Sequence, residues 1–262
     1  MYELELLGGG RMGEALLGGL LDAGSVDPGQ VVVVEKDPAR REHLLGRFAA
    51  VAVVESPVPA RGLIVATKPA DVGPAVAAAA EQGVERILSI AAGVSTHSIE
   101  SAAGDATPVV RAMPNTPSLV GAGAAAVAAG RHATAADVAW ATSVLGAVGT
   151  VVQVPEASLD AVTGLSGSGP AYVFLVAEAL TDAGVLAGLP RATADALVRQ
   201  TLLGAARLLA EGDDGPEALR AAVTSPGGTT AAGLRVLEER AVRAAFIDAV
   251  AAAAQRSREL DG

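Results

Sequence analysis

The chain contains no cysteine, which excludes disulfides, thiolate nucleophiles and cysteine-ligated metals. Its three histidines, His43, His97 and His132, stand far apart in the sequence and do not suggest a zinc site. Aromatic residues are also scarce: there are one tryptophan, two tyrosines and three phenylalanines, too few for a base-stacking surface. The net charge of -10 opposes binding to a phosphate backbone. We therefore expect neither a metal nor a nucleic-acid partner.

Neither of two long uncharged stretches is expected to span a membrane. Two uncharged stretches, 112–130 and 138–155, are interrupted by glycine and proline. The first is better explained as a strand followed by a loop, and the second as a helix followed by a strand, than as spans of about 20 apolar residues. No basic segment followed by an apolar run opens the sequence. We expect a soluble, cytoplasmic protein that does not bind membranes.

A glycine-rich turn follows the first expected strand, Glu3 to Leu7. Gly8, Gly10 and Gly13 have the spacing G-x-G-x-x-G, a helix is expected to continue to near Gly24, and 31–34 is a continuous apolar strand. In this strand–turn–helix–strand context the motif is a dinucleotide fingerprint rather than a flexible turn. Its cofactor-binding candidates are Gly8, Gly9, Gly10, Arg11, Met12 and Gly13.

Charged residues stand where the second strand ends, beside the expected adenosine ribose. The carboxylate of Glu35 would bind a ribose diol and repel a 2′-phosphate, which favours NAD. Lys36, Arg40 and Arg41 could instead pair with that phosphate, which favours NADP. The sequence does not decide between NAD and NADP. Some of these charged side chains must simply be solvated at the end of the strand.

Further strands and one helix complete an alternating α/β half. Strands are expected at 51–54, 63–66, 86–90, 109–112 and 150–154, with a loop at 55–61 and a helix at 135–145. Thr67, Lys68 and Pro69 follow a strand end, where open α/β sheets bind ligands, although a surface lysine is equally consistent. Ala91 and Ala92 follow another strand end, and their small side chains suit a wall for a flat ring.

After Pro155 only helical periodicity remains. Helices are expected at 171–186, from Pro190 onward, at 216–223 and at 240–260. The boundary is therefore near residue 155, giving a dinucleotide-binding domain at 1–155 and an all-α domain at 156–262. The apolar helices after Ala171 predict burial against a second subunit, whereas Trp140 and Phe246 are expected in the core.

The stretch from Thr224 to Thr230 reads Thr-Ser-Pro-Gly-Gly-Thr-Thr and leads into a helical pattern. Glycines leave main-chain N–H groups uncovered, and a helix beginning here adds free donors and the positive end of its dipole. Such a corner can bind a small anion without a charged side chain. An ordinary helix cap fits the same residues, because Ser and Thr are common N-cap residues.

With these motifs in place, the chain resembles pyrroline-5-carboxylate reductases over nearly its whole length. The resemblance is densest at 89–94, 111–117, 160–172 and 223–238, and its most specific motif is Ser-Pro-Gly-Gly-Thr-Thr at 225–230. It implies reduction of 1-pyrroline-5-carboxylate to L-proline with NADPH or NADH, the last step of proline synthesis. It also implies an N-terminal Rossmann-type doubly wound sheet, a C-terminal all-α dimerisation domain, and a homodimer or a larger ring of dimers.

The resemblance also implies roles for individual residues. Thr230 would be catalytic by meeting the ring nitrogen, and the glycine turn would hold the pyrophosphate. The implied substrate-binding residues are Glu156, Ser225, Gly227, Gly228, Thr229 and Thr230, and the further cofactor-binding residues are Glu35, Lys36, Ala66, Thr67, Lys68, Pro69, Ile90, Ala91, Ala92 and Asn115. Family members commonly have Ser or Asn, then Arg and Thr, where this chain has Glu35, Lys36 and Asp37.

Two other functions share parts of this pattern. A hydroxyacid or phosphogluconate-type dehydrogenase has a similar two-domain plan but would need a lysine on the helical domain, and both lysines, Lys36 and Lys68, lie in the first half. A nucleotide-sensing protein without catalysis would keep the glycine turn but would not need the corner at 224–230. Imine reduction needs little acid–base catalysis by side chains, because the protonated imine carbon is already electrophilic enough to accept hydride.

Overall fold

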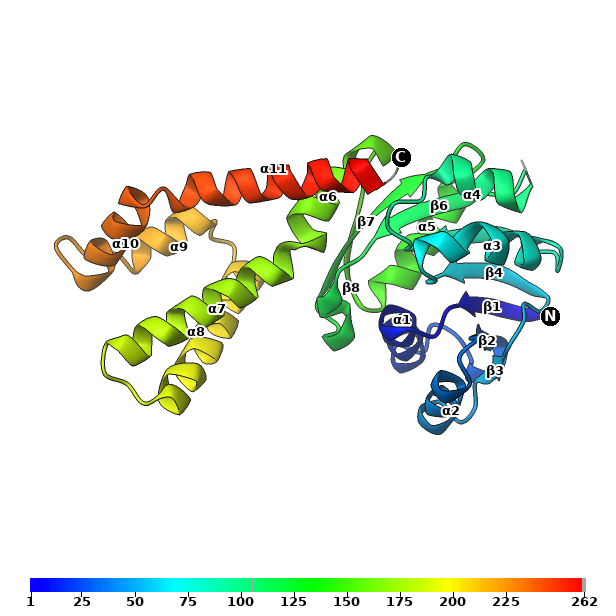
Figure 1. Ribbon diagram of the computed structural model, residues 1–262, viewed down its shortest axis with the longest axis horizontal. Helices are drawn as coiled ribbons and strands as arrows, with labels where there is room; N and C mark the ends of the chain where they lie inside the picture. Colours follow the sequence, from blue (N-terminus) through cyan, green and yellow to red (C-terminus); the bar gives the residue numbers. More distant parts are fainter. Residues whose placement is uncertain (105, 261–262) are drawn as a thin grey trace. The chain divides into compact units, whose positions relative to one another are not determined.

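The computed structural model describes residues 1–104 and 106–260, which form two compact units (Figure 1). One unit contains Met1–Ser168 together with the end of the last helix from Ala251 onward, and the other is Gly169–Val250. The first unit therefore extends past the expected boundary at residue 155. The end of the last helix contacts this first unit, in part through a hydrogen bond of 2.7 Å from Ser257 Oγ to Asp160 Oδ1.

The first unit is built on one eight-stranded sheet of order β3-β2-β1-β4-β5-β6-β7-β8. Strands β1 to β6 are parallel, β7 is antiparallel to β6, and β8 is parallel to β7. Their bounds are β1 Tyr2–Leu7, β2 Val31–Val34, β3 Ala52–Val54, β4 Ala60–Val65, β5 Arg86–Ser89, β6 Val109–Met113, β7 Gly123–Ala129 and β8 Gly149–Gln153. The Rossmann-type doubly wound sheet is confirmed.

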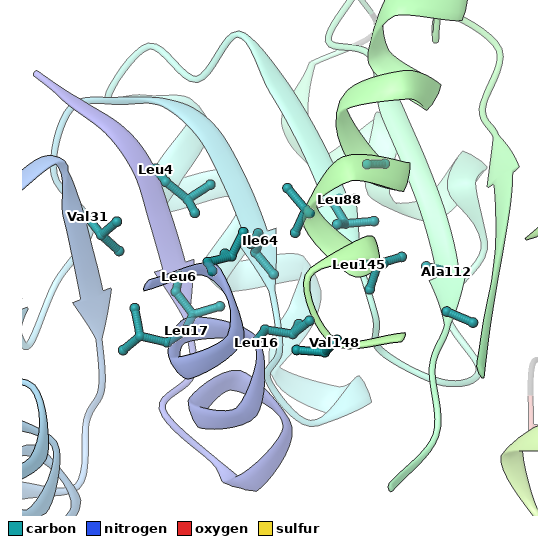
Figure 2. Packing of buried hydrophobic residues seen from close by; sticks show 14 of the residues in the cluster. Leu4, Leu6, Leu16, Leu17, Val31, Ile64, Leu88, Ala112, Leu145 and Val148 are labelled. Atoms are coloured by element: carbon teal, nitrogen blue, oxygen red, sulfur yellow. The ribbon is translucent and has the colours of Figure 1, made fainter. Parts of the chain in front are cut away.

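Helices cover both faces of this sheet: α1 Arg11–Asp22, α2 Pro38–Arg47, α3 Val72–Ala80, α4 Thr96–Ala103 and α5 Ala135–Gly146, with the single turn α6 Leu159–Val162 after β8. On one face Leu16 and Leu17 of α1 pack with Leu145 of α5 and with Leu6 and Ile64 of the sheet (Figure 2). On the other face, the apolar side chains of α3 and α4 pack against β1, β4 and β5. Burial on both faces explains the continuous apolar run of a strand such as β2.

The stretch 112–130 was expected to be a strand followed by a loop, and the loop is wrong in its second half, because Gly123–Ala129 forms β7. Alanine has a low β propensity, so its sequence of glycine, alanine and one valine carries little strand signal. Its residues pair with both β6 and β8, and Ala126 and Ala128 are buried. Tertiary pairing rather than local preference makes this segment a strand.

The second unit is helical, as expected. It contains α7 Gly169–Leu186, α8 Arg191–Glu211, α9 Pro216–Ala222, α10 Thr229–Glu239 and the first half of α11 Val242–Leu260. Helices α7 and α8 pack as a hairpin, with a Cβ built on Gly184 falling only 3.0 Å from the Ala194 Cβ. Among their described residues only Thr181 and Ala194 are buried, although both helices are rich in leucine and valine.

Two aromatic residues expected in the core differ in their surroundings. Trp140 packs against the main core and covers Gly62, where a Cβ would lie 2.9 Å from the indole, so this expectation is confirmed. Phe246 is 44% exposed within one chain, and the expectation of a core position is wrong for the isolated subunit. Phe174 is 61% exposed, and both phenylalanines belong to a helical unit with many uncovered apolar side chains.

Candidate functional site

A cleft of about 550 Å³ lies at the carboxyl ends of β1, β2 and β4. The parallel register sets Leu7 beside Val34 and Val65, so the segments that follow these three strands meet at one edge. Open α/β sheets bind ligands at this edge. The predicted cofactor residues in the lining are Gly8, Gly10, Glu35, Lys36, Ala66, Thr67 and Lys68.

The glycine turn leaves no room for side chains at two of its three motif positions. Gly8 has φ +97°, and a Cβ there would lie 2.7 Å from the Ala66 carbonyl oxygen. A Cβ on Gly13 would lie 2.2 Å from the carbonyl oxygen of Gly8. Gly10 instead faces open space and is the N-cap of α1, with no side-chain cap hydrogen bond. The turn thus presents an uncovered helix N-terminus to the cleft, as pyrophosphate binding requires.

The hydroxyl group of Thr67 supports the same interpretation. Its Oγ1 atom is buried and, among the residues that the structure describes, has no hydrogen-bond partner. Buried hydroxyl groups normally have a hydrogen-bond partner. A buried hydroxyl that lines a cleft and has no such partner is therefore suited to bind a polar ligand. Together with the open N-terminus of α1, it makes the cleft fit a dinucleotide.

Gly9 is held through both of its main-chain groups. Its N–H donates to Glu35 Oε2 at 2.9 Å, and its carbonyl oxygen accepts from Arg40 Nε. The other carboxylate oxygen of Glu35 accepts from the N–H of Asp37 at 2.9 Å. The segment after β2 therefore fastens the glycine turn, a contact that the spacing of the motif does not reveal.

Glu14, on the first turn of α1, binds the side chains of Arg40, His43 and Arg47 from α2. Burial would raise the pKa of Glu14, but these hydrogen bonds and the charge of Arg40 lower it to about 2. The ionised carboxylate therefore fixes α2 against α1 just behind the glycine turn. Glu14 lies one residue beyond the glycine motif and was not among the predicted residues.

The remaining predicted cofactor residues are near this edge but do not line the cleft. Ile90, Ala91 and Ala92 follow β5, with Ala91 buried and Ala92 exposed. Arg11 lines a separate hollow between α1 and the turn after β6, Met12 is half-buried behind the glycine turn, and Pro69 begins a 3₁₀ turn. Asn115 is buried, and its side chain bonds to the main chain of Ala124 and Ser166.

Glu156 follows β8 and binds two residues far away in the sequence. Its carboxylate accepts from the N–H and Oγ1 of Thr96, at 2.8 and 2.6 Å, and from Arg111 Nη1 at 3.2 Å. Burial would raise the pKa of Glu156, but the hydrogen bonds from Thr96 and Arg111 and the charge of Arg111 lower it overall. Within one chain, this predicted substrate residue ties the N-terminus of α4 to β6.

The corner before α10 lies in the helical unit and is open to solvent. Gly227 has φ +71°, the N–H of Gly228 donates to the Ser225 carbonyl at 3.0 Å, and α10 begins at Thr229. Gly228 is the N-cap and offers no side chain, and within the described chain the N–H groups of Thr229 and Thr230 meet no acceptor. Ser225 is exposed and Thr230 half-buried. The predicted substrate residues at 225–230 are thus together, with free donors for an anion, whereas Glu156 belongs to the other unit.

Two family models match this chain. "Pyrroline-5-carboxylate reductase dimerisation" matches residues 156–260, and "NADP oxidoreductase coenzyme F420-dependent" matches residues 3–93. The chain is 45% identical to the pyrroline-5-carboxylate reductase of Synechocystis sp., with 98% of each chain covered. It is 37% identical to that of Escherichia coli, again with 98% of each covered.

Solved structures give the same result. A pyrroline-5-carboxylate reductase from Coxiella burnetii superposes with a TM-score of 0.93 at 35% identity, covering 100% of this chain and 99% of that one. The Plasmodium falciparum pyrroline carboxylate reductase with NADP bound superposes with a TM-score of 0.86 at 27% identity, covering 100% and 98%.

Proposed function

The chain belongs to the pyrroline-5-carboxylate reductase family, and from this premise we propose how its residues serve the family's reaction. The protein reduces 1-pyrroline-5-carboxylate to L-proline by hydride transfer from a reduced nicotinamide nucleotide. This reaction is the last step of proline synthesis, and we place it in the cytoplasm. A dehydrogenase that acts on an alcohol would need a proton acceptor on the helical half, which contains no lysine.

The cleft at the edge of the sheet is the nucleotide site in this proposal. When bound there, NADPH or NADH supplies the hydride. The uncovered N-terminus of α1 binds the pyrophosphate, and the hydroxyl of Thr67 and the amine of Lys68 contact the nucleotide beside it. Ile90, Ala91 and Ala92, at the end of β5, form the wall beside the nicotinamide ring, and Asn115 holds the neighbouring turn in place.

The corner at 225–230 binds the substrate carboxylate. The observation that carries this assignment is the free N–H groups of Thr229 and Thr230 at the start of α10. Together with the Ser225 hydroxyl and the amide of Gly227, they give an anion several donors without a buried cation, while the N–H of Gly228 already donates to the Ser225 carbonyl and shapes the corner. The reaction requires this corner and the nucleotide cleft to meet around the substrate, in one chain or across a dimer.

Thr230 orients the imine nitrogen by a hydrogen bond from its hydroxyl. The protonated imine carbon is already electrophilic, so the protein must align it with the donor and exclude water. Glu156 remains on the substrate side in this proposal. We assign it a positioning role, because its observed partners are Thr96 and Arg111.

The helical unit forms the contact between two copies of the chain. The segment from Glu156 to Leu186 is long and apolar enough to cross a membrane by length and composition, and little of it is buried within one subunit. The same residues begin the region matched by the dimerisation model. A second copy that covers α7 and α8 accounts for their apolar surface, and a larger ring of dimers is compatible with it.

The test follows NADH and NADPH oxidation with the imino acid as substrate. Thr230→Val removes one hydroxyl at constant size, and we expect kcat/KM to fall by about 10- to 100-fold, the usual effect of one lost hydrogen bond to a charged group. Thr150→Val, on an exposed part of β8, is the matched control and should retain full activity. Unchanged turnover in Thr230→Val would refute the role of Thr230. Nucleotide binding without any turnover of the imine would instead favour a sensor.

A further inference from the structure

We propose that Glu35 makes this enzyme select NADH over NADPH. The inference depends on the proposed nucleotide site, because it concerns the adenosine end of the same cleft. Glu35 follows β2, where a doubly wound sheet places the ribose of a bound dinucleotide. Its side chain lines the cleft between the glycine turn and the loop after β3.

The Glu35 carboxylate is held in a fixed position. One oxygen accepts from the Gly9 N–H and the other from the Asp37 N–H, each at 2.9 Å. A carboxylate has about four acceptor positions, so these two bonds leave others for a ribose diol. A 2′-phosphate at the same place would bring a second anion against a carboxylate that cannot swing away without releasing the glycine turn.

The two arginines that could neutralise a 2′-phosphate are engaged elsewhere. Arg40 binds the Gly9 carbonyl and the buried carboxylate of Glu14. Arg41 donates to the carbonyl oxygens of Glu35 and Lys36 at 2.9 and 2.8 Å and lies 3.8 Å from Glu55. Neither arginine is part of the cleft lining.

Lys36, next to Glu35 in the chain, lines the cleft and is exposed. It shares the lining with the carboxylates of Glu35, Asp37 and Glu55. The cleft lining also contains Lys68 and Asp71, so two ammonium groups stand against four carboxylates and the lining is negative overall. The surroundings therefore favour an uncharged ribose diol over a phosphate dianion.

The experiment measures the dissociation constants of NADH and NADPH by the fluorescence of the bound nucleotide, together with kcat/KM for both. We expect the unmodified enzyme to bind NADH about tenfold or more tightly than NADPH, the range given by one opposing charge. Glu35→Gln should reduce this preference about tenfold, mainly by tightening NADPH, because its amide oxygen can still accept from Gly9. Glu35→Ser provides a second, smaller variant should the glutamine disturb the Asp37 contact.

Glu42→Gln is the matched control, since it removes the same charge from an exposed position on α2 outside the cleft lining. Its nucleotide preference should stay unchanged; an equal shift would mean a general charge effect and would overturn the role of Glu35. Tighter binding of NADPH by the unmodified enzyme would also overturn it. So would a selective loss of NADPH affinity in Lys36→Ala. Imine reduction with either nucleotide upholds the proposed function whatever the preference, whereas its absence with both refutes that function separately.

Discussion

Asn115 donates a hydrogen bond from Nδ2 to the main-chain oxygen of Ser166, 3.0 Å away and 51 residues later in the chain. Its Oδ1 accepts from the N–H of Ala124 at 2.9 Å. Ser166 lies in the one turn of π-helix from Thr163 to Gly167, where a Cβ on Gly167 would lie 2.8 Å from the Met113 side chain. The turn after β6, the start of β7 and this π-helical turn are therefore joined by one buried amide.

Replacing Asn115 by aspartate should destabilise this junction. The substitution removes the donor to Ser166 and turns a carboxylate oxygen toward a carbonyl oxygen inside the protein. We expect the free energy of unfolding to fall by about 2–4 kcal/mol, since the substitution introduces a buried charge without a cationic partner and removes one hydrogen bond. Thermal unfolding of the two proteins measures the effect. Gln153→Glu makes the same amide-to-carboxylate change at an exposed position and should leave the midpoint almost unaltered; a comparable loss there would contradict the assignment.

Glu156→Gln should weaken the contact between α4 and β6. One oxygen remains for Thr96, but the charge facing the buried side chain of Arg111 is lost, and we expect about 1–3 kcal/mol less stability at neutral pH. Because the folded-state pKa of Glu156 is lowered, the stability from its ionised form is present above the unfolded-state value. It is lost as the pH falls below that value. The difference between the two proteins should therefore shrink in acid, which denaturant titrations at several pH values would detect. A constant difference would contradict the role of the charge.

The shape of the glycine turn was predictable because its causes are local. Gly8 and Gly13 are glycines for steric reasons that involve the immediate turn and the neighbouring strand. The strand–turn–helix context therefore points to this edge of the sheet from the sequence alone. The corner at 225–230 was predictable in the same way, because a helix that starts after two glycines must leave N–H groups free.

Contacts between distant residues could not be predicted in this way. Thr96 and Arg111 lie 60 and 45 residues from Glu156, and no local pattern links them. The position of Phe246 was misjudged for a related reason. Helical periodicity identifies an apolar face, but it does not indicate whether that face is buried by the same chain or by another one.

A third prediction concerns Glu5, the buried carboxyl in the middle of β1. Neither of its oxygens has a hydrogen-bond partner of normal geometry in the described part of the chain. Burial raises the pKa of Glu5 to about 7, and the main chain of Val58 opposes this only in part. The folded-state pKa of Glu5 exceeds its unfolded-state value. The contribution of Glu5 to stability is therefore fully present below the unfolded-state pKa and is lost as the pH rises through about 7.

Glu5→Gln should abolish this pH dependence. At pH 8 we expect the variant to be more stable than the unmodified protein by about 1–3 kcal/mol, and near pH 4.5 the two should differ little. Unfolding by denaturant at both pH values provides the comparison. Glu3→Gln, on the same strand but exposed, should give the same small difference at both pH values. A Glu5→Gln protein that is less stable at pH 8 would contradict the burial of an unpartnered charge.

Gly13→Ala tests whether the glycine turn must keep its observed shape. The new Cβ would lie 2.2 Å from the Gly8 carbonyl oxygen, a main-chain atom that cannot move without opening the turn. We expect nucleotide affinity to fall about tenfold or more and the thermal midpoint to drop, because overpacking costs about 1–3 kcal/mol. Gly46→Ala is the matched control: it lies in α2, where an added Cβ would meet no described atom within 4 Å beyond its own helix backbone and chain neighbours, so alanine should stabilise the helix by about 0.5–1 kcal/mol. Fluorescence titration with NADH and a melting curve measure both effects. Normal nucleotide binding by Gly13→Ala would show that the turn tolerates a side chain, and the close approach of α1 to β1 would then not be what shapes the site.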